Sequence, residues 1–375
     1  MSDEETSNVD VVEHTTTTIS EPEPQPTTTT ISEPAEPTTT PPSPPETTTT
    51  TTGISEESLS KFQSSIQSLS SIIPSIPPSI TFTTTNKNSN HHPALSLLHD
   101  PQTSSEISSL LRQPNSGAGD NNLCRWLYDT FQSNDPSLQL VVLRFIPTIA
   151  GLYLSRIPLR KPLAGFEAVL LALYAHETTS RAGQPVTVNV PDLSHPSLYH
   201  ESVAPNKNNA TALNLAVISP SLEPHGTVRS TRRARIVGVA LELYYSKIHQ
   251  MPVSSKMEFC EFCKVWAGKE DHDEDETDKT MKKKEGRIPL PWELLQPVMR
   301  ILGHCMMGCG VKEKELLEAA MGACKSLYGR SLHDINAKGI LATESLIRLG
   351  KMALESKDIV VVDHTEISIS NVISI

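Results

Sequence analysis

Positive charge is missing from the start of this chain. Residues 1–60 contain no Lys or Arg but 12 Asp or Glu, and runs of Thr alternate there with Pro, Ser and Glu. Such a composition offers too little apolar surface to offset the entropy of ordering the backbone, which predicts a long disordered N-terminal region. The acidic start, which has no apolar run, does not resemble a secretory signal peptide.

Excess charge of either sign is also missing from the rest of the chain. The whole chain has a formal net charge of −11, from 32 basic and 43 acidic residues. Removing the 12 acidic residues of the first sixty leaves 31 acidic against 32 basic side chains. This near-neutral remainder gives no electrostatic basis for binding nucleic acid.

Catalytic sequence motifs are absent as well. The chain has neither a G-x-S-x-G nucleophile elbow nor a G-x4-G-K-S/T phosphate loop. The acidic run at Asp271 begins like a calcium loop, but Glu276 and Lys282 stand where such a loop needs Gly and Glu. We therefore expect a protein that is not an enzyme and that carries no cofactor.

Cysteine is sparse, with six residues, and a chain without a secretory signal is expected to keep its thiols reduced. Cys260 and Cys263 lie three residues apart in an apolar helical pattern, and Cys305 and Cys309 lie in a Met-rich one. Structural zinc sites usually place paired cysteines on tight turns, so we expect buried thiols. A zinc-structured protein or metalloenzyme that uses these four cysteines is the alternative.

Apolar residues recur at helical spacing over much of the remaining sequence. The segment 137–156 is apolar on nearly all sides, which predicts a helix surrounded by protein; Arg144 and Pro147 argue against a membrane span. The residues 186–190 alternate like a strand inside a long connection. Helices are predicted over 54–72, 104–112, from 122, over 137–156, 162–179, 230–251, from 252, and over 291–309, 312–328 and 331–357.

These elements predict an all-α protein with a stacked, solenoid-like helical domain, although no fixed sequence repeat is present. The β-prone end of the chain is left unplaced. The expected organisation is a disordered tail at 1–53, a partly ordered linker with short helices at 54–121, a helical domain at 122–357 with a disordered acidic insert at 269–285, and a C-terminal tail at 358–375.

A basic cluster at the start of the helix near residue 230 is a candidate contact for phosphate, anionic lipid or protein. Cations are slightly unfavourable at a helix N-terminus, so an acidic partner is expected nearby. An exposed first turn is the simpler interpretation. A stand-alone peripheral membrane protein that uses this cluster and residues 282–284 is a second alternative. The cluster consists of Arg229, Arg232, Arg233 and Arg235.

Several segments of this chain resemble the hyccin family. They are 126–132 (WLYDTFQ), 138–147 (LQLVVLRFIP), 166–174 (FEAVLLALY) and, most specifically, 190–201 (VPDLSHPSLYHE). The resemblance extends over about 122–355 and is closer to the plant branch. The last of these segments has no assigned role; its distinctive residues are Pro191, Leu193, Ser194, Pro196, Tyr199, His200 and Glu201.

The resemblance implies an all-helical, non-catalytic adaptor subunit. Hyccin-like proteins pair with a tetratricopeptide-repeat scaffold subunit and stabilise a type III alpha phosphatidylinositol 4-kinase. They help recruit that kinase to a lipid-anchored plasma-membrane protein, and so support synthesis of phosphatidylinositol 4-phosphate. For this chain the resemblance implies a place in the cytosol and at the cytoplasmic face of the plasma membrane.

Overall fold

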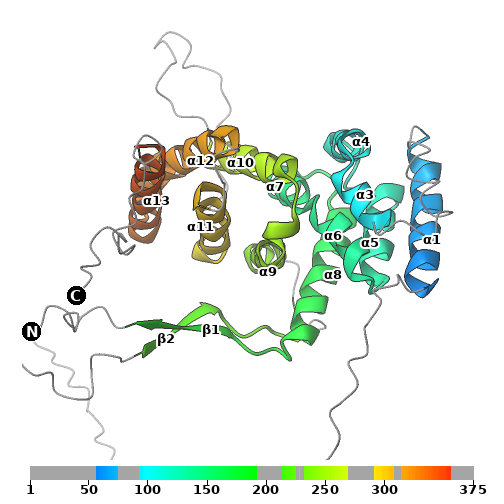
Figure 1. The fold of residues 1–375 in the computed structure, drawn as a ribbon, viewed down its shortest axis with the longest axis horizontal. Helices are drawn as coiled ribbons and strands as arrows, with labels where there is room; N and C mark the ends of the chain where they lie inside the picture. The colour runs from blue at the N-terminus through cyan, green and yellow to red at the C-terminus, as the bar shows by residue number, and fades with distance from the viewer. Residues whose placement is uncertain are drawn as a thin grey trace, which may run out of the picture. The chain divides into compact units, whose positions relative to one another are not determined.

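The computed structural model describes residues 56–74, 93–191, 213–224, 228, 232–268, 291–307 and 314–355. Twelve α-helices occupy most of these residues, and the strands among them form one two-stranded sheet (Figure 1). The predicted all-α class is thereby confirmed. The expected disordered tail at 1–53, the acidic insert at 269–285 and the C-terminal tail at 358–375 lie outside the described residues.

The helices stack by contacts between successive layers. Helix α5 (Asn122–Gln132) packs on α1 (Glu56–Ile72), α6 (Pro136–Leu143) and α8 (Ala164–Ser180). Helix α8 packs on α9 (Arg233–Ser246), which packs on α11 (Trp292–Met307). Helix α11 packs on α12 (Lys314–His333) and α13 (Ala337–Glu355). Helix α10 (Val253–Ala267) contacts both α7 (Ile146–Arg156) and α12. One continuous apolar core therefore runs from the first described helix to the last helices of the chain, as the stacked architecture requires.

The core extends upstream of residue 122. Helices α1 (Glu56–Ile72), α3 (Pro93–His99) and α4 (Pro101–Arg112) precede α5 (Asn122–Gln132) and bury apolar residues in the common core. Helix α3 was not predicted, because its seven residues are too few to show a helical period. It contacts α6 and α4, so the upstream segment contributes to the packed domain.

The single helix predicted over 137–156 is wrong. The chain forms α6 (Pro136–Leu143) and α7 (Ile146–Arg156), which meet at a bend of 45°. Pro147 has no N–H to donate and its ring clashes with the carbonyl four residues before it, so one straight helix cannot pass through this position. At the bend, the buried Arg144 side chain donates to the carbonyl of Leu98 and, at 2.9 Å, to Ser254 Oγ.

No single helix in the described part of the chain has the length and apolar character to cross a membrane. The bent pair α6 and α7 meets that test by length and composition when its two halves are taken together.

The middle of the chain contains α8 (Ala164–Ser180), β1 (Val186–Pro191), β2 (Leu213–Ser219), α9 (Arg233–Ser246) and a 3₁₀ turn (Ile248–Gln250). The strand expected at 186–190 is confirmed, and β2 is its antiparallel partner. The helix expected over 230–251 ends at Ser246, where the 3₁₀ turn replaces its last part.

The last helices are α10 (Val253–Ala267), α11 (Trp292–Met307), α12 (Lys314–His333) and α13 (Ala337–Glu355). Helix α12 runs five residues beyond its predicted end at 328. Arg330 Nε donates to Asp334 Oδ2 at 2.6 Å across its last turn. The next helix begins after Asn336, whose Oδ1 accepts from the N–H of Gly339 at 3.0 Å and so caps α13.

Helices α9 and α11 cross at Gly238. A Cβ built on this residue would lie 2.6 Å from the backbone carbonyl oxygen of Glu293, which cannot move without moving α11. The glycine thus fixes how closely the two helices approach, and with it the position of α9 relative to the helices that follow.

We expect Gly238→Ala to lower the free energy of unfolding by about 1–3 kcal/mol, because the added methyl group pushes two packed backbones apart. The matched control is Gly303→Ala on α11, where an added Cβ would meet its nearest side-chain atom at 3.5 Å. That change should be neutral or stabilise by up to about 1 kcal/mol, through the higher helix propensity of Ala. Urea unfolding of the two variants measures the difference; equal losses would contradict the proposed role of Gly238.

Candidate functional site: an anchored apolar ribbon

The two strands form a ribbon that projects from the C-terminal end of α8 (Figure 1). Opposed residues of an antiparallel pair share a face, and here Val188 is opposite Ala216 while Asn189 is opposite Leu215. A bulge in the register lies at the base of the ribbon, next to Val186. Successive residues therefore alternate between two faces along both strands.

Both faces of the ribbon present apolar side chains to solvent. Neither strand contains a charged residue; their sequences are VTVNVP and LNLAVIS. Exposed sheet edges normally carry charges that block pairing with other chains, and isolated hairpins are marginally stable in water. A large exposed apolar patch of this kind marks an interaction surface. One face carries Val186, Val188 and Val190, and the other carries Leu213, Leu215 and Val217.

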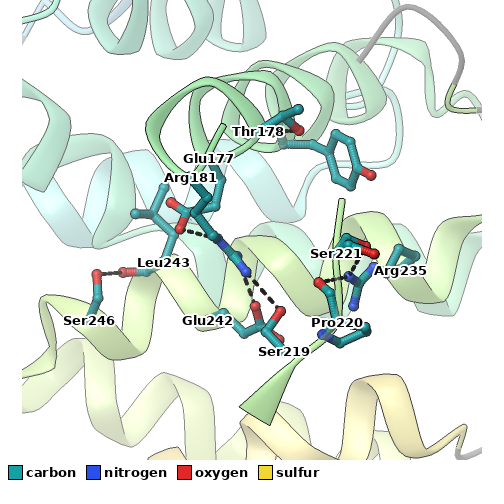
Figure 2. Close-up of polar contacts among 11 residues, drawn as sticks. Glu177, Thr178, Arg181, Ser219, Pro220, Ser221, Arg235, Glu242, Leu243 and Ser246 are labelled. Carbon is teal, nitrogen blue, oxygen red and sulfur yellow. Dashed lines mark hydrogen bonds and ion pairs between the residues drawn. The ribbon is translucent and has the colours of Figure 1, made fainter. Parts of the chain in front are cut away.

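Arg181 fixes the base of this ribbon to two helices (Figure 2). It follows the last residue of α8, and its guanidinium donates from Nε to Glu177 Oε1 at 2.6 Å and from Nη2 to Glu242 Oε2, on α9, at 3.0 Å. The third nitrogen, Nη1, donates to Ser219 Oγ at 2.8 Å, on the last residue of β2. One nearly buried side chain therefore joins α8, α9 and β2.

The turn between α8 and β1 adds backbone contacts to this anchor. Gly183 adopts a φ of +72°, which favours glycine, and its N–H donates to the carbonyl of Thr178 at 3.0 Å. The carbonyl of Gly183 accepts from the N–H of Leu222 at 2.9 Å. The entry to β1 and the exit from β2 are thereby held together, so the ribbon leaves the helices in a defined direction.

The predicted basic cluster lies beside the exit from β2, in a cleft of about 410 Å³. Arg232 forms an ion pair with Glu223, and Arg235 Nη2 donates to the carbonyls of Pro220 at 2.8 Å and Ser221 at 3.2 Å (Figure 2). The acidic partner expected for this helix start is therefore present in the same chain.

The other arginines of the cluster have different surroundings. Arg233 is half-buried and lies beside the phenol of Tyr153, and burial raises the pKa of that phenol to about 12. Arg229 lies outside the described residues, as do residues 282–284. The described part of the cluster thus contacts the chain itself, and Arg232 is its exposed member.

Three of the four cysteines weighed as zinc ligands are buried thiols: Cys260, Cys263 and Cys305. Burial raises the pKa of Cys263 well above its usual value, with the neighbouring Cys324 and Cys305 adding to the shift. Burial likewise raises the pKa of Cys324 to about 12. Within the ranges that the structure describes, no three His, Cys, Asp or Glu side chains are grouped to hold a metal ion; Cys309 lies outside those ranges.

Of the residues that build the ribbon and its anchor, the strand at 186–190 was predicted from the sequence, whereas β2 and Arg181 were not. A signal for β2 exists, because apolar residues alternate at 213, 215 and 217. Arg181 and Glu242 gave no local signal, since their pairing joins residues 61 positions apart. Of the distinctive family-like residues, Pro191 ends β1, and Leu193 to Glu201 lie outside the described residues, in the connection between the strands.

Comparison with known protein families identifies a relationship. The hyccin family model matches residues 88–365, well over half of the chain. The match begins before α3, includes the ribbon and the connection between its strands, and continues past the end of α13.

We expect Arg181→Met to lower the free energy of unfolding by about 3–5 kcal/mol, because it leaves two nearly buried carboxylates without their partner. The control is Arg348→Met on α13, which breaks an exposed ion pair with Glu344 and should cost at most about 1 kcal/mol. Chemical unfolding measures both losses. Hydrogen exchange of the ribbon amides should rise in the Arg181 variant alone; unchanged ribbon exchange would mean that Arg181 does not anchor the strands.

Proposed function

Because this chain belongs to the hyccin family, we propose that it is a non-catalytic adaptor subunit of a phosphatidylinositol 4-kinase complex. It stabilises the complex and helps recruit it to the cytoplasmic face of the plasma membrane, where the complex makes phosphatidylinositol 4-phosphate. Its partners are a tetratricopeptide-repeat scaffold, a type III alpha phosphatidylinositol 4-kinase and a lipid-anchored membrane protein.

The observation that carries this proposal is the uncharged, anchored ribbon. Adaptor subunits work by contact, and a ribbon with exposed Val and Leu on both faces offers more apolar surface than a monomeric protein usually leaves in water. Helical-repeat scaffolds present extended concave surfaces. Because the ribbon is already held at its base, little conformational entropy of its strands is lost when it binds such a surface, which favours tight binding.

The same physics accounts for mutual stabilisation within the complex. A partner that binds only the folded adaptor raises the free energy of unfolding by mass action. Covering the ribbon also removes the exposed, uncharged strand edges through which free chains associate. The adaptor should therefore behave poorly when it is made alone and well when it is made with its scaffold.

The test is affinity purification of the tagged protein from cells of its source organism, followed by mass spectrometry to identify the proteins that co-purify. Wild type should recover a tetratricopeptide-repeat scaffold and a phosphatidylinositol 4-kinase. Leu215→Asp, which places a charge on the ribbon, should reduce that recovery at least about tenfold, since burying an unpaired charge at an interface costs several kcal/mol.

The matched control for that test is Val265→Asp on α10, because Val265 is 64% exposed and Leu215 is 67% exposed. The control should recover partners as wild type does. Failure of wild type to recover a scaffold or kinase under mild conditions would contradict the proposed function. Equal recovery of the scaffold and kinase by the two variants would not contradict the proposed function, but it would show that the ribbon does not contact the partners.

A second candidate function is that of a peripheral membrane protein that acts alone through Arg229, Arg232, Arg233, Arg235 and residues 282–284. Arg232 is paired with Glu223 and Arg235 is bonded to two carbonyls, which leaves less positive charge for lipid headgroups. Recruitment through partner proteins is therefore the better supported of the two.

We expect the isolated protein to remain unbound when it is centrifuged with vesicles that contain anionic lipid. Flotation with those vesicles, compared with flotation with neutral vesicles, makes the measurement. Binding that falls with added salt and is lost in Arg232→Ala would favour direct membrane contact through the basic cluster.

A further inference from the structure

Helices α11 and α13 lie side by side and run in the same direction (Figure 1). A Cβ built on Gly339 would lie 3.1 Å from Leu295 Cδ2, and one built on Gly350 would lie 3.1 Å from Met306 Sδ. The contacts thus advance along both helices together. An open groove of about 640 Å³ follows this parallel pair, with α9 at its edge. A trough between two parallel helices has the shape that a third helix fills.

Small and apolar side chains line the groove. Gly303, Ala342 and Ser345 are its small residues, and they let the backbone of an incoming helix approach closely. A Cβ built on Gly303 would meet its nearest side-chain atom at 3.5 Å, so this position is not crowded from within the fold. Met299 and Leu346 add apolar surface to the same lining.

Exposed apolar side chains extend the lining of the groove. Leu341, Leu349 and Met352 are 68%, 43% and 63% exposed, and their spacing places them on the same side of α13 as Ser345. Met307, which lines the groove from α11, is 63% exposed. A continuous apolar patch of this kind marks an interaction surface.

The charges beside this patch are positive. No Asp or Glu is among the described residues that line the groove, whereas Arg300 is one of them. The Arg300 guanidinium lies 4.2 Å from the centre of the Tyr245 ring, and the ammonium of Lys338, on the same side of α13 as Ser345, lies 5.6 Å from that of Trp292. An aromatic ring positions a cation without neutralising it. The groove therefore favours an occupant that carries carboxylates beside an apolar face.

Two other occupants fit this arrangement less well. A second copy of the chain would bring its own Arg300 and Lys338 against the same two cations, and like charges that face each other across an interface are unfavourable. An anionic bilayer has the right charge, but a flat surface would contact the rims of the groove and leave its hollow unfilled. A single helix satisfies both the shape and the charge.

We propose that the groove between α11 and α13 binds an amphipathic helix of a partner protein, with Asp or Glu on both sides of the apolar face of that helix. This contact is separate from the ribbon. The apolar face of the bound helix covers Leu349, Met352 and Met307, and its carboxylates lie near Arg300 and Lys338.

Two designed helical peptides test the charge and shape of the site. Both carry Leu at the spacing i, i+3, i+4, i+7, and they differ only in flanking residues, which are Glu in one peptide and Lys in the other. Fluorescence anisotropy with the isolated full chain should show that the Glu peptide binds at least about tenfold more tightly than the Lys peptide. Added salt should reduce this difference.

Arg300→Glu should lower the affinity for the Glu peptide at least about tenfold, because it places a carboxylate in the wall of the groove. The matched control is Lys325→Glu, which makes the same change of charge at an exposed position of α12 that does not line the groove. The control should bind the Glu peptide as wild type does. Equal losses in the two variants would overturn the proposal.

Hydroxyl-radical footprinting locates the bound peptide, because methionine oxidation follows side-chain exposure. The Glu peptide should lower the oxidation of Met307 and Met352 at least about threefold. Met257 on α10 is half-buried and does not line the groove, so its rate should not change. Buried Met251 reports whether each variant remains folded.

Equal binding of the two peptides, or binding of neither, would overturn the proposal. Oxidation of Met307 and Met352 that is no faster than that of Met257 in the isolated full chain would assign the groove to another segment of the same chain. Protection that rises with protein concentration would assign it to a second copy, and protection by anionic vesicles would assign it to lipid; each of these results would also overturn the proposal. The peptides contain no sequence of the proposed partners, so these results do not depend on whether the kinase complex is recovered.

Discussion

The guanidinium of Arg181 is the contact on which the functional surface depends. It engages two carboxylates and one hydroxyl from three different elements, and its side chain is only 9% exposed. A buried charge is costly unless each of its donors is satisfied. Here each of the three guanidinium nitrogens donates one hydrogen bond, and two of the acceptors are carboxylates, which offsets much of the cost of burying the charge. The network fixes where β2 ends relative to α8 and α9, and so determines how the ribbon leaves the helices.

Other buried arginines use the same solution elsewhere in the stack. Arg156 donates from Nη2 to the carbonyl of Gln113 at 2.6 Å and from Nη1 to Ser116 Oγ at 3.0 Å, which ties α7 to the end of α4. Arg144 does the same between α3 and α10. In each case a planar, always charged group donates to carbonyls or hydroxyls at a helix end or a bend. These contacts join helices that are distant in sequence.

The difference between local patterns and contacts that join distant segments explains which features the sequence could predict. Periodicity is a local property, so most helices and the strand at β1 followed from it. The break between α6 and α7 does not follow from periodicity, because the apolar pattern continues through it; the signal for the break is Pro147, which does not fit inside a straight helix. The ribbon anchor could not be predicted, because the partners of Arg181 on α9 and β2 come together only when the tertiary structure forms. The same holds for Gly238, whose necessity depends on a carbonyl of another helix.

The ribbon exposes apolar side chains to solvent, whereas the core buries them. The core buries apolar residues from many helices. The stability of the fold therefore does not require exposed Val and Leu side chains on two uncharged strands. Those strands are a liability for a protein that works alone, because unpaired edges without charge recruit other chains. The hydrogen-bonded Arg181 at their base fixes the direction in which the strands leave the helices. That combination is useful where a partner covers the ribbon, which is why this geometry favours contact with a partner.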